Sequence, residues 1–363
     1  MPRVSILVST YKGEKYLGQA IGSLLNQSFT DFELIVVDDA SVDTTWDILQ
    51  HIHDRRLVLF RNDNNLGIGA SLNRALQAAK GEFIAVQDHD DISLPNRFQE
   101  QVEFLRSRTD VALVGSPGWV IDGEGLRTGM WRVPQEDIDL KWGILINEPF
   151  LHTGVMFRRN VLEHIGGGYS TDPIYRFAED YELLSRIATQ FRVANLSNPL
   201  VCWREHRSSA SDLNRFQQEQ ASFHISLRNI RRLIPDTDVH LRRLVQVLMQ
   251  TKPGTPTNIS DTEVRLTIGF LCSLLKAFYE RHDFTPSQVR AHRRHVQWKI
   301  GKHLVALAYR RDGKRNLSCR VALLASVFKL AFQITRDLVF KSGDRDGRRK
   351  IKRVSPENES ATR

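Results

Sequence analysis

The sequence predicts an α/β protein whose mainly parallel, Rossmann-like sheet is flanked by helices and followed by an α-helical C-terminal region. Through the first third of the chain, short apolar runs alternate with helical patterns, a rhythm typical of β-α-β units. The short runs are continuously apolar, as strands covered on both faces by helices require. From about residue 213 onward the pattern is helical.

The individual elements follow in order along the chain. Four strands are expected at 4–9, 34–37, 57–60 and 83–86, each followed by a helix, at 16–26, 44–53, 67–79 and 95–107. The first helix carries Leu17, Ile21 and Leu24 on one face, and Gly81 is expected to close the third helix. A fifth strand is expected at 111–115. Weaker periodicity from 116 to 176 predicts irregular and mixed structure there.

Three regions are predicted from these patterns. Residues 1–212 form the α/β domain, residues 213–340 form a helical accessory region, and residues 341–363 form a basic tail that is too polar to fold by itself. A polar Pro/Thr linker is expected at 251–257.

Charge is distributed unevenly along the chain. The net charge of +9 combines residues 1–200, with 19 Lys and Arg against 27 Asp and Glu, and the remainder, with 32 against 15. This split predicts that residues 1–200 form a carboxylate-rich part and that the remaining, basic residues face an anionic partner. Membrane lipid, nucleic acid and a phosphorylated acceptor all fit, and charge alone does not choose among them.

Cysteine usage and hydropathy predict a cytoplasmic location. Cys202, Cys272 and Cys319 are widely spaced, form no metal-binding pattern and favour a reducing compartment. The N-terminus lacks the charged and apolar regions of a signal peptide. A membrane span is not expected, because even the apolar segment 318–340 contains three basic residues.

Polar residues follow each predicted strand of the parallel sheet. In such a sheet the carboxyl ends of the strands meet at one edge, where ligands bind. Five carboxylates are expected to converge there. The residues that follow the four strands are, in order, Thr10 and Tyr11; Asp38 and Asp39; Asn64 and Asn65; and Asp88, Asp90 and Asp91.

This acidic edge predicts a divalent cation. The glycine-rich fingerprints of dinucleotide and phosphate binding are absent from the sequence. Carboxylates repel phosphate, so an edge of this kind can hold a nucleotide diphosphate only with a hard cation in between, Mg²⁺ or Mn²⁺. Asp38 and Asp39 also suit a turn that caps a helix. Asp88, Asp90 and Asp91 suit a helix cap less well, because three neighbouring acids repel one another without a cation.

Together these motifs resemble glycosyltransferase family 2, whose members have the GT-A fold. The similarity covers residues 4 to about 206 and depends on the order and spacing of the motifs. They are Asp38-Asp39-Ala40-Ser41, Asn65-Leu66-Gly67, Asn73-Arg74-Ala75, Gly81-Glu82-Phe83-Ile84, Asp88-His89-Asp90-Asp91, Glu179-Asp180 and Trp203-Arg204-Glu205-His206.

The resemblance implies roles for particular residues. Asp180 would be the catalytic base, Asp90 and His206 would contact the metal, and the remaining candidates would bind substrates. The expected nucleotide-binding residues are Thr10, Tyr11, Asp39, Asn65, Arg74 and Asp88; the expected donor and acceptor pocket residues are Asp91, His152, Thr153 and Glu179. Three of these assignments have structural alternatives. Arg74 also suits a solvated helix face, His206 a plain surface position, and Asp180 a helix N-terminus stabilised by the macrodipole.

The implied activity is inverting, metal-dependent transfer of a hexosyl or N-acetylhexosaminyl group. The donor would be a nucleotide-diphosphate sugar, by default a UDP-sugar. The acceptor hydroxyl would belong to a glycan or a lipid-linked acceptor in the biosynthesis of cell-surface polysaccharide or glycan. Asp180 would deprotonate this hydroxyl while the metal stabilises the departing diphosphate.

Two other classes of protein compete with this interpretation. A sugar nucleotidyltransferase would need a basic, glycine-rich loop after the first strand, and Lys12 with Gly13 is too little for that task. A noncatalytic protein that binds nucleotide sugars or nucleic acid would use the basic C-terminal half. The presence of Asp90 and Asp180 argues against a degenerate transferase, and nucleic acid is not an expected partner.

The late segment 318–340 has an apolar stripe opposite basic residues. Val321, Leu324 and Phe328 lie on the stripe, and Lys329 lies opposite. One interpretation is a helix on an anionic membrane surface, which would make the protein peripheral on the inner face of the cell membrane. The other is a helix that faces a protein core, followed by a solvated tail.

Overall fold

A computed structural model describes residues 1–250 and 260–308 of the chain. The chain divides into two compact units. The first contains residues 1–243 and 274–292, and the second contains 244–273 and the described residues from 293 onward. The functional division at residue 212 stays a prediction, and the first unit continues past that point to Arg243.

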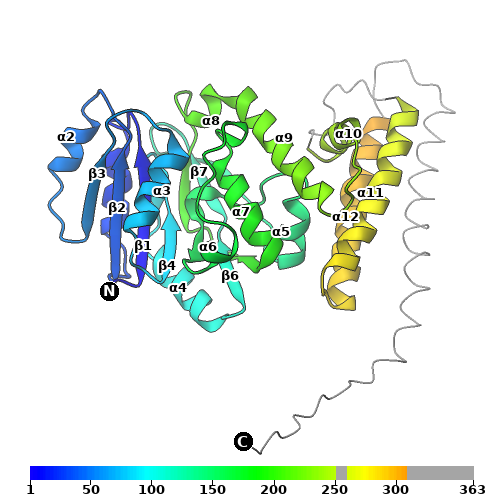
Figure 1. Cartoon of the computed structure of the whole chain (residues 1–363), viewed down its shortest axis with the longest axis horizontal. Helices are drawn as coiled ribbons and strands as arrows, with labels where there is room; N and C mark the ends of the chain where they lie inside the picture. Colours follow the sequence, from blue (N-terminus) through cyan, green and yellow to red (C-terminus); the bar gives the residue numbers. More distant parts are fainter. Residues whose placement is uncertain (251–259, 309–363) are drawn as a thin grey trace, which may run out of the picture. The chain divides into compact units, whose positions relative to one another are not determined.

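The core of the first unit is a seven-stranded sheet (Figure 1). Its order is β10-β6-β9-β4-β1-β2-β3, and β9 runs antiparallel to β4 and β6 while the other pairs are parallel. The mainly parallel sheet is therefore confirmed. The strand bounds are β1 (Val4–Thr10), β2 (Phe32–Asp38), β3 (Leu57–Arg61), β4 (Phe83–Val86), β6 (Val111–Gly115), β9 (Met156–Arg158) and β10 (Arg192–Asn195).

Helices cover both faces of this sheet. On β1, Ile6 packs in the same buried cluster as α1, whereas its neighbour Leu7 packs in the cluster of α3 and α7. Burial on both faces explains why the strand is apolar at successive positions, and each such side chain contributes roughly 2 kcal/mol on leaving water. The helices are α1 (Leu17–Leu25), α2 (Thr45–Gln50) and α4 (Arg97–Ser107) on one face, and α3 (Ile68–Ala78), α5 (Asp137–Gly143) and α7 (Glu179–Gln190) on the other.

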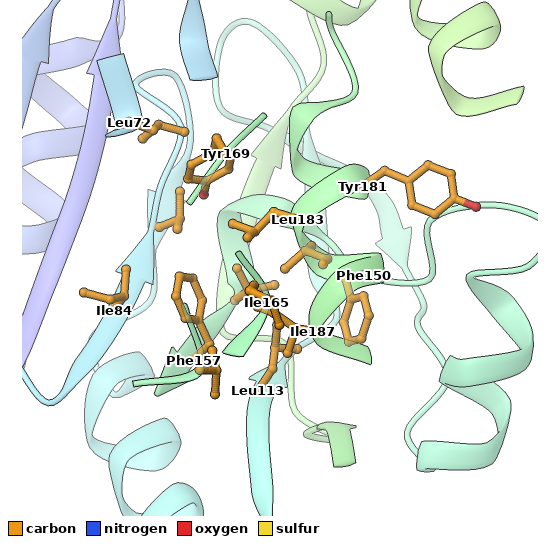
Figure 2. Close-up of a cluster of buried hydrophobic side chains, with 14 of the residues drawn as sticks. Leu72, Ile84, Leu113, Phe150, Phe157, Ile165, Tyr169, Tyr181, Leu183 and Ile187 are labelled. Atoms are coloured by element: carbon orange, nitrogen blue, oxygen red, sulfur yellow. The ribbon is translucent and has the colours of Figure 1, made fainter. Parts of the chain in front are cut away.

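One of these packed layers lies beneath α7 (Figure 2). Leu183 and Ile187 of α7 belong to the same buried cluster as Leu113 of β6 and Phe157 of β9. Because this face of α7 is buried, the start of the helix has a fixed position relative to the sheet.

A second, four-stranded sheet was not foreseen. Its order is β5-β11-β7-β8, and a β-bulge interrupts β7 between Val120 and Ile121. The strands are β5 (Ile92–Ser93), β7 (Gly118–Ile121), β8 (Arg127–Trp131) and β11 (Val201–Arg204). The expectation of irregular, mixed structure over 116–176 otherwise agrees with the short elements there. They are η1 (His152–Gly154), α6 (Val161–His164) and η2 (Pro173–Tyr175).

Gly81 has a different function from the one expected. The helix α3 ends at Ala78, the backbone of the following Ala79 is extended, and Gly81 does not have a positive φ. A Cβ at Gly81 would lie 2.5 Å from the backbone nitrogen of Ser5. Glycine is therefore needed because the loop passes against β1, and not as a helix cap.

The C-terminal part is helical as predicted, as far as the structure describes it. Its helices are α8 (Ala210–Leu213), α9 (Arg215–Arg231), α10 (Val239–Gln250), α11 (Asp261–Arg281) and α12 (Pro286–Ala308). Among the described residues, no helix is both long and apolar enough to cross a bilayer. The linker at 251–257, the segment 318–340, the tail 341–363 and Cys319 lie outside the described residues.

Candidate active site

The predicted site residues gather at a topological switch point. β2 and β3 lie on one side of β1, and β4, the next strand along the chain, lies on the other side. Thr10 ends β1, Asp38 ends β2, and the acidic segment 88–91 follows β4. In parallel sheets the crevice at such a reversal is where ligands bind.

Asp39 connects the loop after β2 to the start of α3. Its carboxylate accepts hydrogen bonds from Asn62 Nδ2 at 2.7 Å and from the backbone nitrogens of Leu66 at 2.9 Å and Gly67 at 2.8 Å. A carboxylate has about four acceptor positions. Asp39 is buried, and these three bonds leave it capacity for one further donor.

The other predicted nucleotide-binding residues lie around Asp39. The Thr10 hydroxyl is buried without a hydrogen-bond partner, and the side chain of Tyr11 is 40% exposed. Asn65 Nδ2 lies 3.4 Å from the carbonyl oxygen of Asp39. Arg74 donates to the Asn62 side-chain oxygen, so it contacts Asp39 only through Asn62.

Asp90 and His206 are brought together from positions 116 residues apart. Asp90 Oδ2 lies 2.9 Å from His206 Nε2, and both side chains are largely buried. Burial opposes ionisation of Asp90, but the hydrogen bond from His206 and the nearby charge of His89 outweigh it, so the pKa of Asp90 is lowered. His206 is half-buried and paired with Asp90, and its metal role stays a prediction.

Arg204 holds the acidic segment 88–91 in place, through contacts that the sequence did not reveal. Its backbone nitrogen donates to Asp91 Oδ1 at 2.7 Å, and its guanidinium donates to the carbonyl oxygen of Asp90 at 2.8 Å and to Gln19 at 2.9 Å. The Asp91 carboxyl is buried, and this burial, with the negative charges of Asp90 and Asp88, holds its pKa well above the usual range. The Asp91 carboxyl therefore anchors the acidic segment to β11 through the Arg204 backbone.

His152 joins Asp88 to the other side of the crevice. Its Nδ1 lies 3.2 Å from Asp88 Oδ1, and its Nε2 lies 3.2 Å from the Tyr169 hydroxyl. Burial lowers the pKa of His152, but the adjacent Asp88 carboxylate outweighs it and raises the pKa to about 9. The imidazole is therefore cationic near neutrality. The buried Thr153 hydroxyl accepts a hydrogen bond from the Asp88 backbone nitrogen at 3.3 Å.

Asn73 fixes the Tyr169 backbone. Its Nδ2 donates to the Tyr169 carbonyl oxygen, and its Oδ1 accepts from the Tyr169 backbone nitrogen, both at 2.8 Å. This pair of bonds gives the Asn73-Arg74-Ala75 motif a physical reason, since it holds Tyr169 against His152.

The first turn of α7 carries the predicted base. Burial raises the pKa of Asp180, and the charge of His152 partly offsets the effect. Burial also raises the pKa of Glu179 to about 7. A third acid, Glu148, was not foreseen, because it lies in a segment without periodicity. One of its carboxyl oxygens is buried without a partner, and burial next to Asp180 raises its pKa well above the usual range.

The residues present fit a divalent cation in part. Within residues 1–250 and 260–308, no three His, Cys, Asp or Glu side chains are grouped so that they could hold a metal ion. Asp90 Oδ2 and His206 Nε2, hydrogen-bonded to each other in this structure, lie 2.9 Å apart. That separation matches the ~3 Å between adjacent ligands of an octahedral Mg²⁺, an ion that typically takes one or two protein ligands beside phosphate oxygens and water.

The comparisons with known proteins agree with the motifs. Residues 5–166 match the family model for glycosyl transferase family 2. The putative glycosyltransferase EpsE of Bacillus subtilis is 36% identical over 211 residues, which are 56% of this chain and 73% of EpsE. WfaP of Escherichia coli, a UDP-Glc:alpha-D-GlcNAc-diphosphoundecaprenol beta-1,3-glucosyltransferase, is 27% identical over 219 residues, 60% of this chain and 83% of WfaP.

A solved structure shares the fold. The S. aureus TarS fragment 1–349 in complex with UDP-GlcNAc superposes with a TM-score of 0.54 and 18% identity, covering 91% of this chain and 92% of TarS. The seven-stranded sheet with its acidic segment after β4, the family model and the EpsE similarity lead to one conclusion: this chain is a glycosyltransferase that belongs to glycosyltransferase family 2.

Proposed function

We propose that the enzyme transfers a sugar from a nucleotide-diphosphate donor to an acceptor hydroxyl with inversion at the anomeric carbon. The observation that carries the proposal is the pairing of Asp90 with His206 at the switch point of the sheet. Nucleotide-binding candidates lie after β1 and β2, and the half-buried Asp180 lies at the start of α7. This is the order of parts that a donor, its diphosphate and an acceptor require.

The donor is held at two ends. Thr10 and Tyr11 line the base and ribose pocket, and the remaining acceptor capacity of Asp39 takes an N–H of the base. Asn65 and Asp88 complete the nucleotide contacts, and Arg74 supports them through Asn62. TarS has been crystallised with UDP-GlcNAc, and WfaP is a glucosyltransferase that uses UDP-Glc, so we propose a UDP-sugar donor.

Asp90 and His206 would hold Mg²⁺ or Mn²⁺. When bound, the ion neutralises the charge of the leaving diphosphate, so that no protein acid is needed to protonate it. Arg204 holds the segment that carries Asp90, through its bonds to the Asp91 carboxylate and the Asp90 carbonyl oxygen.

Asp180 acts as the base. As the acceptor oxygen forms its bond to the anomeric carbon, its proton moves to the Asp180 carboxylate, and the bond from that carbon to the diphosphate oxygen breaks. Attack from the face opposite the leaving group inverts the anomeric centre. Glu179, His152 and Thr153 line the space in which donor and acceptor meet.

The acceptor is a glycan or a lipid-linked glycan of cell-surface polysaccharide biosynthesis. WfaP, by its name, extends a sugar on diphosphoundecaprenol, which supports a membrane-anchored acceptor. An enzyme for such an acceptor works at the membrane surface, and we propose a cytoplasmic, peripheral association. On α12, the side chains of Arg294 and Lys302 are exposed, and Trp298 is 61% exposed. Cationic side chains around an exposed indole suit an anionic bilayer surface.

Replacement of Asp180 tests the mechanism. Asp180→Asn keeps the shape of the side chain and removes the base, so we expect transfer to fall roughly 10³-fold. Binding of UDP, measured by calorimetry, should stay within about twofold, because Asp180 is proposed to contact the acceptor hydroxyl and not the nucleotide. The control is Asp172→Asn. Asp172 is exposed, and its side chain accepts a hydrogen bond from the Ile174 backbone nitrogen that the amide oxygen of asparagine can also accept. Unchanged turnover in Asp180→Asn would remove the mechanism.

A further inference from the structure

The small sheet carries a pair of tryptophans on one of its faces. Trp203 lies on β11 and Trp131 on β8, the outer strand of the sheet. Their ring centroids are 5.1 Å apart, and the rings stand at 75° to each other. Trp131 is 42% exposed. The two indoles therefore form an aromatic corner that is open to solvent.

The strand register shows why the rings meet. Val201 of β11 pairs with Gly118 of β7, and Gly118 pairs in turn with Trp131. Trp203 lies two residues beyond Val201 and on the same face, because side chains alternate along a strand. Gly118 has no side chain, and Leu151 fills the space above it, with its Cδ2 2.6 Å from the Cβ position. The Trp131 ring meets the Trp203 ring beside this position. Gly129 leaves further room on this face, since a Cβ there would meet only Val120.

The aromatic corner adjoins the acidic segment. β11 pairs antiparallel with β5, and Val201 and Cys202 lie opposite Ser93 and Ile92. Trp203 and Asp91 are the next residues beyond this paired segment. The bond from the Arg204 backbone nitrogen to Asp91 confirms the proximity. The corner therefore lies beside the acidic segment that carries Asp88 and Asp90.

The opposite face of the same sheet is different. Trp119 alternates with Gly118 and Val120, so it points away from the corner, and the Arg127 guanidinium covers its ring at 4.7 Å. A cation over an indole face satisfies the attraction that this face offers. Trp119 is thus a tryptophan of the same sheet that is already engaged.

We propose that Trp131 and Trp203 form the binding platform for a neutral pyranose of the acceptor glycan. The inference rests on the proposed function and names a further part of that site. The C–H faces of a sugar ring pack on indole faces, and two rings at 75° suit the face and edge of one pyranose. A lipid chain or a protein partner would need a larger apolar patch than two rings provide.

Saturation-transfer NMR tests the platform. The probes are the octyl glycosides of glucose, galactose, mannose, rhamnose and N-acetylglucosamine, each added to the full-length enzyme with UDP and Mg²⁺. We expect ring protons of at least one glycoside to be saturated by the wild-type enzyme. In Trp131→Ala the saturation should fall at least about fivefold, the effect of losing one aromatic contact. Trp203→Phe, a milder change at a less exposed position, should reduce it partially.

The matched control is Trp119→Phe, which should leave saturation unchanged, and UDP binding should be equal in all three variants. The platform would be overturned if no glycoside is saturated by wild-type enzyme that binds UDP, if saturation survives in Trp131→Ala, or if Trp119→Phe reduces it equally. Failure of the proposed function is a separate result, because in that case UDP itself does not bind with Mg²⁺.

Discussion

Arg204 brings three parts of the chain together around the acidic segment. Its guanidinium donates to the carbonyl oxygens of Asp90 and Asp122 and to the side chain of Gln19, and it also lies over the ring of Tyr16, 4.5 Å from the centroid. These acceptors are held in place by a planar group with several donors, which lysine cannot imitate. The position of the proposed metal ligands therefore depends on a residue that is not expected to touch the metal.

We predict that Arg204→Lys lowers the free energy of unfolding by about 3 kcal/mol, because buried acceptors lose their partners. Transferase activity should fall more than stability alone explains, since Asp90 is no longer positioned. Urea denaturation and turnover of the donor check this pair of effects. Arg207→Lys, an exposed arginine three residues later, serves as the control. Equal effects of the two substitutions would argue against a positioning role.

Glu179 supplies a prediction of pH dependence. Its folded pKa of about 7 is raised from 4.5, so the folded protein binds this proton more tightly than the unfolded chain. The contribution of Glu179 to stability is therefore most favourable below pH 4.5 and declines as the pH rises to about 7. Glu179→Gln should remove this decline, worth at most about 3 kcal/mol. The exposed Glu163→Gln should not, and parallel pH curves for wild type and Glu179→Gln would contradict the assignment.

At the residue scale, the acids that follow strands were predictable, because strand ends can be located from apolar runs. Glu148 was not predictable, since it lies where no periodicity indicates an element. The role of Arg204 was not predictable either, although the neighbouring His206 was a candidate. Burial of an arginine depends on acceptors from distant segments, and a single sequence carries no local signal for that.

At the scale of the element, the strands of the large sheet were predictable. Continuous apolar runs mark strands that are buried on both faces, and β1, β2, β3, β4 and β6 start and end within two residues of expectation. The small sheet was not predictable. β11 pairs with β5 and β7 across roughly a hundred residues, and strands of two to five residues have no clear periodicity.

Gly81 offers a test of close approach between elements. We predict that Gly81→Ala destabilises the protein by about 2 kcal/mol or more, because the new methyl would press on backbone atoms of β1. Gly18→Ala is the matched change. It lies on α1 with nothing within 4 Å of its Cβ position, and alanine should stabilise that helix by up to about 1 kcal/mol. Thermal denaturation of both variants measures the change in Tm. A change of the same sign in both variants would refute this explanation.

For the whole molecule, the uneven charge distribution suggests how the enzyme meets its acceptor. The part before residue 200 is acidic and the part after it is basic, and within residues 286–302 α12 carries no Asp or Glu. The sequence pointed to segment 318–340 for membrane contact, which lies outside the described residues. The exposed indole of Trp298 and the neighbouring Lys302 now provide a surface that can be tested.

We predict that the full-length enzyme floats with vesicles that contain phosphatidylglycerol and not with pure phosphatidylcholine vesicles. High salt should release it, because attraction between exposed charges is screened. Trp298→Ala and Lys302→Glu should each reduce flotation, while Arg55→Glu, an exposed change in the α/β unit, should not. Retention of RNA on filters at high salt, with no vesicle binding, would instead favour a nucleic-acid partner.

The central claim is that the acidic edge of the sheet accepts a diphosphate only through a divalent cation held by Asp90 and His206. Calorimetric titration of UDP into the enzyme, with Mn²⁺ and then with EDTA, measures this directly. We predict that chelation weakens UDP binding at least about tenfold and that Asp90→Asn in Mn²⁺ does the same. Equal affinity for UDP with and without the cation would contradict the claim.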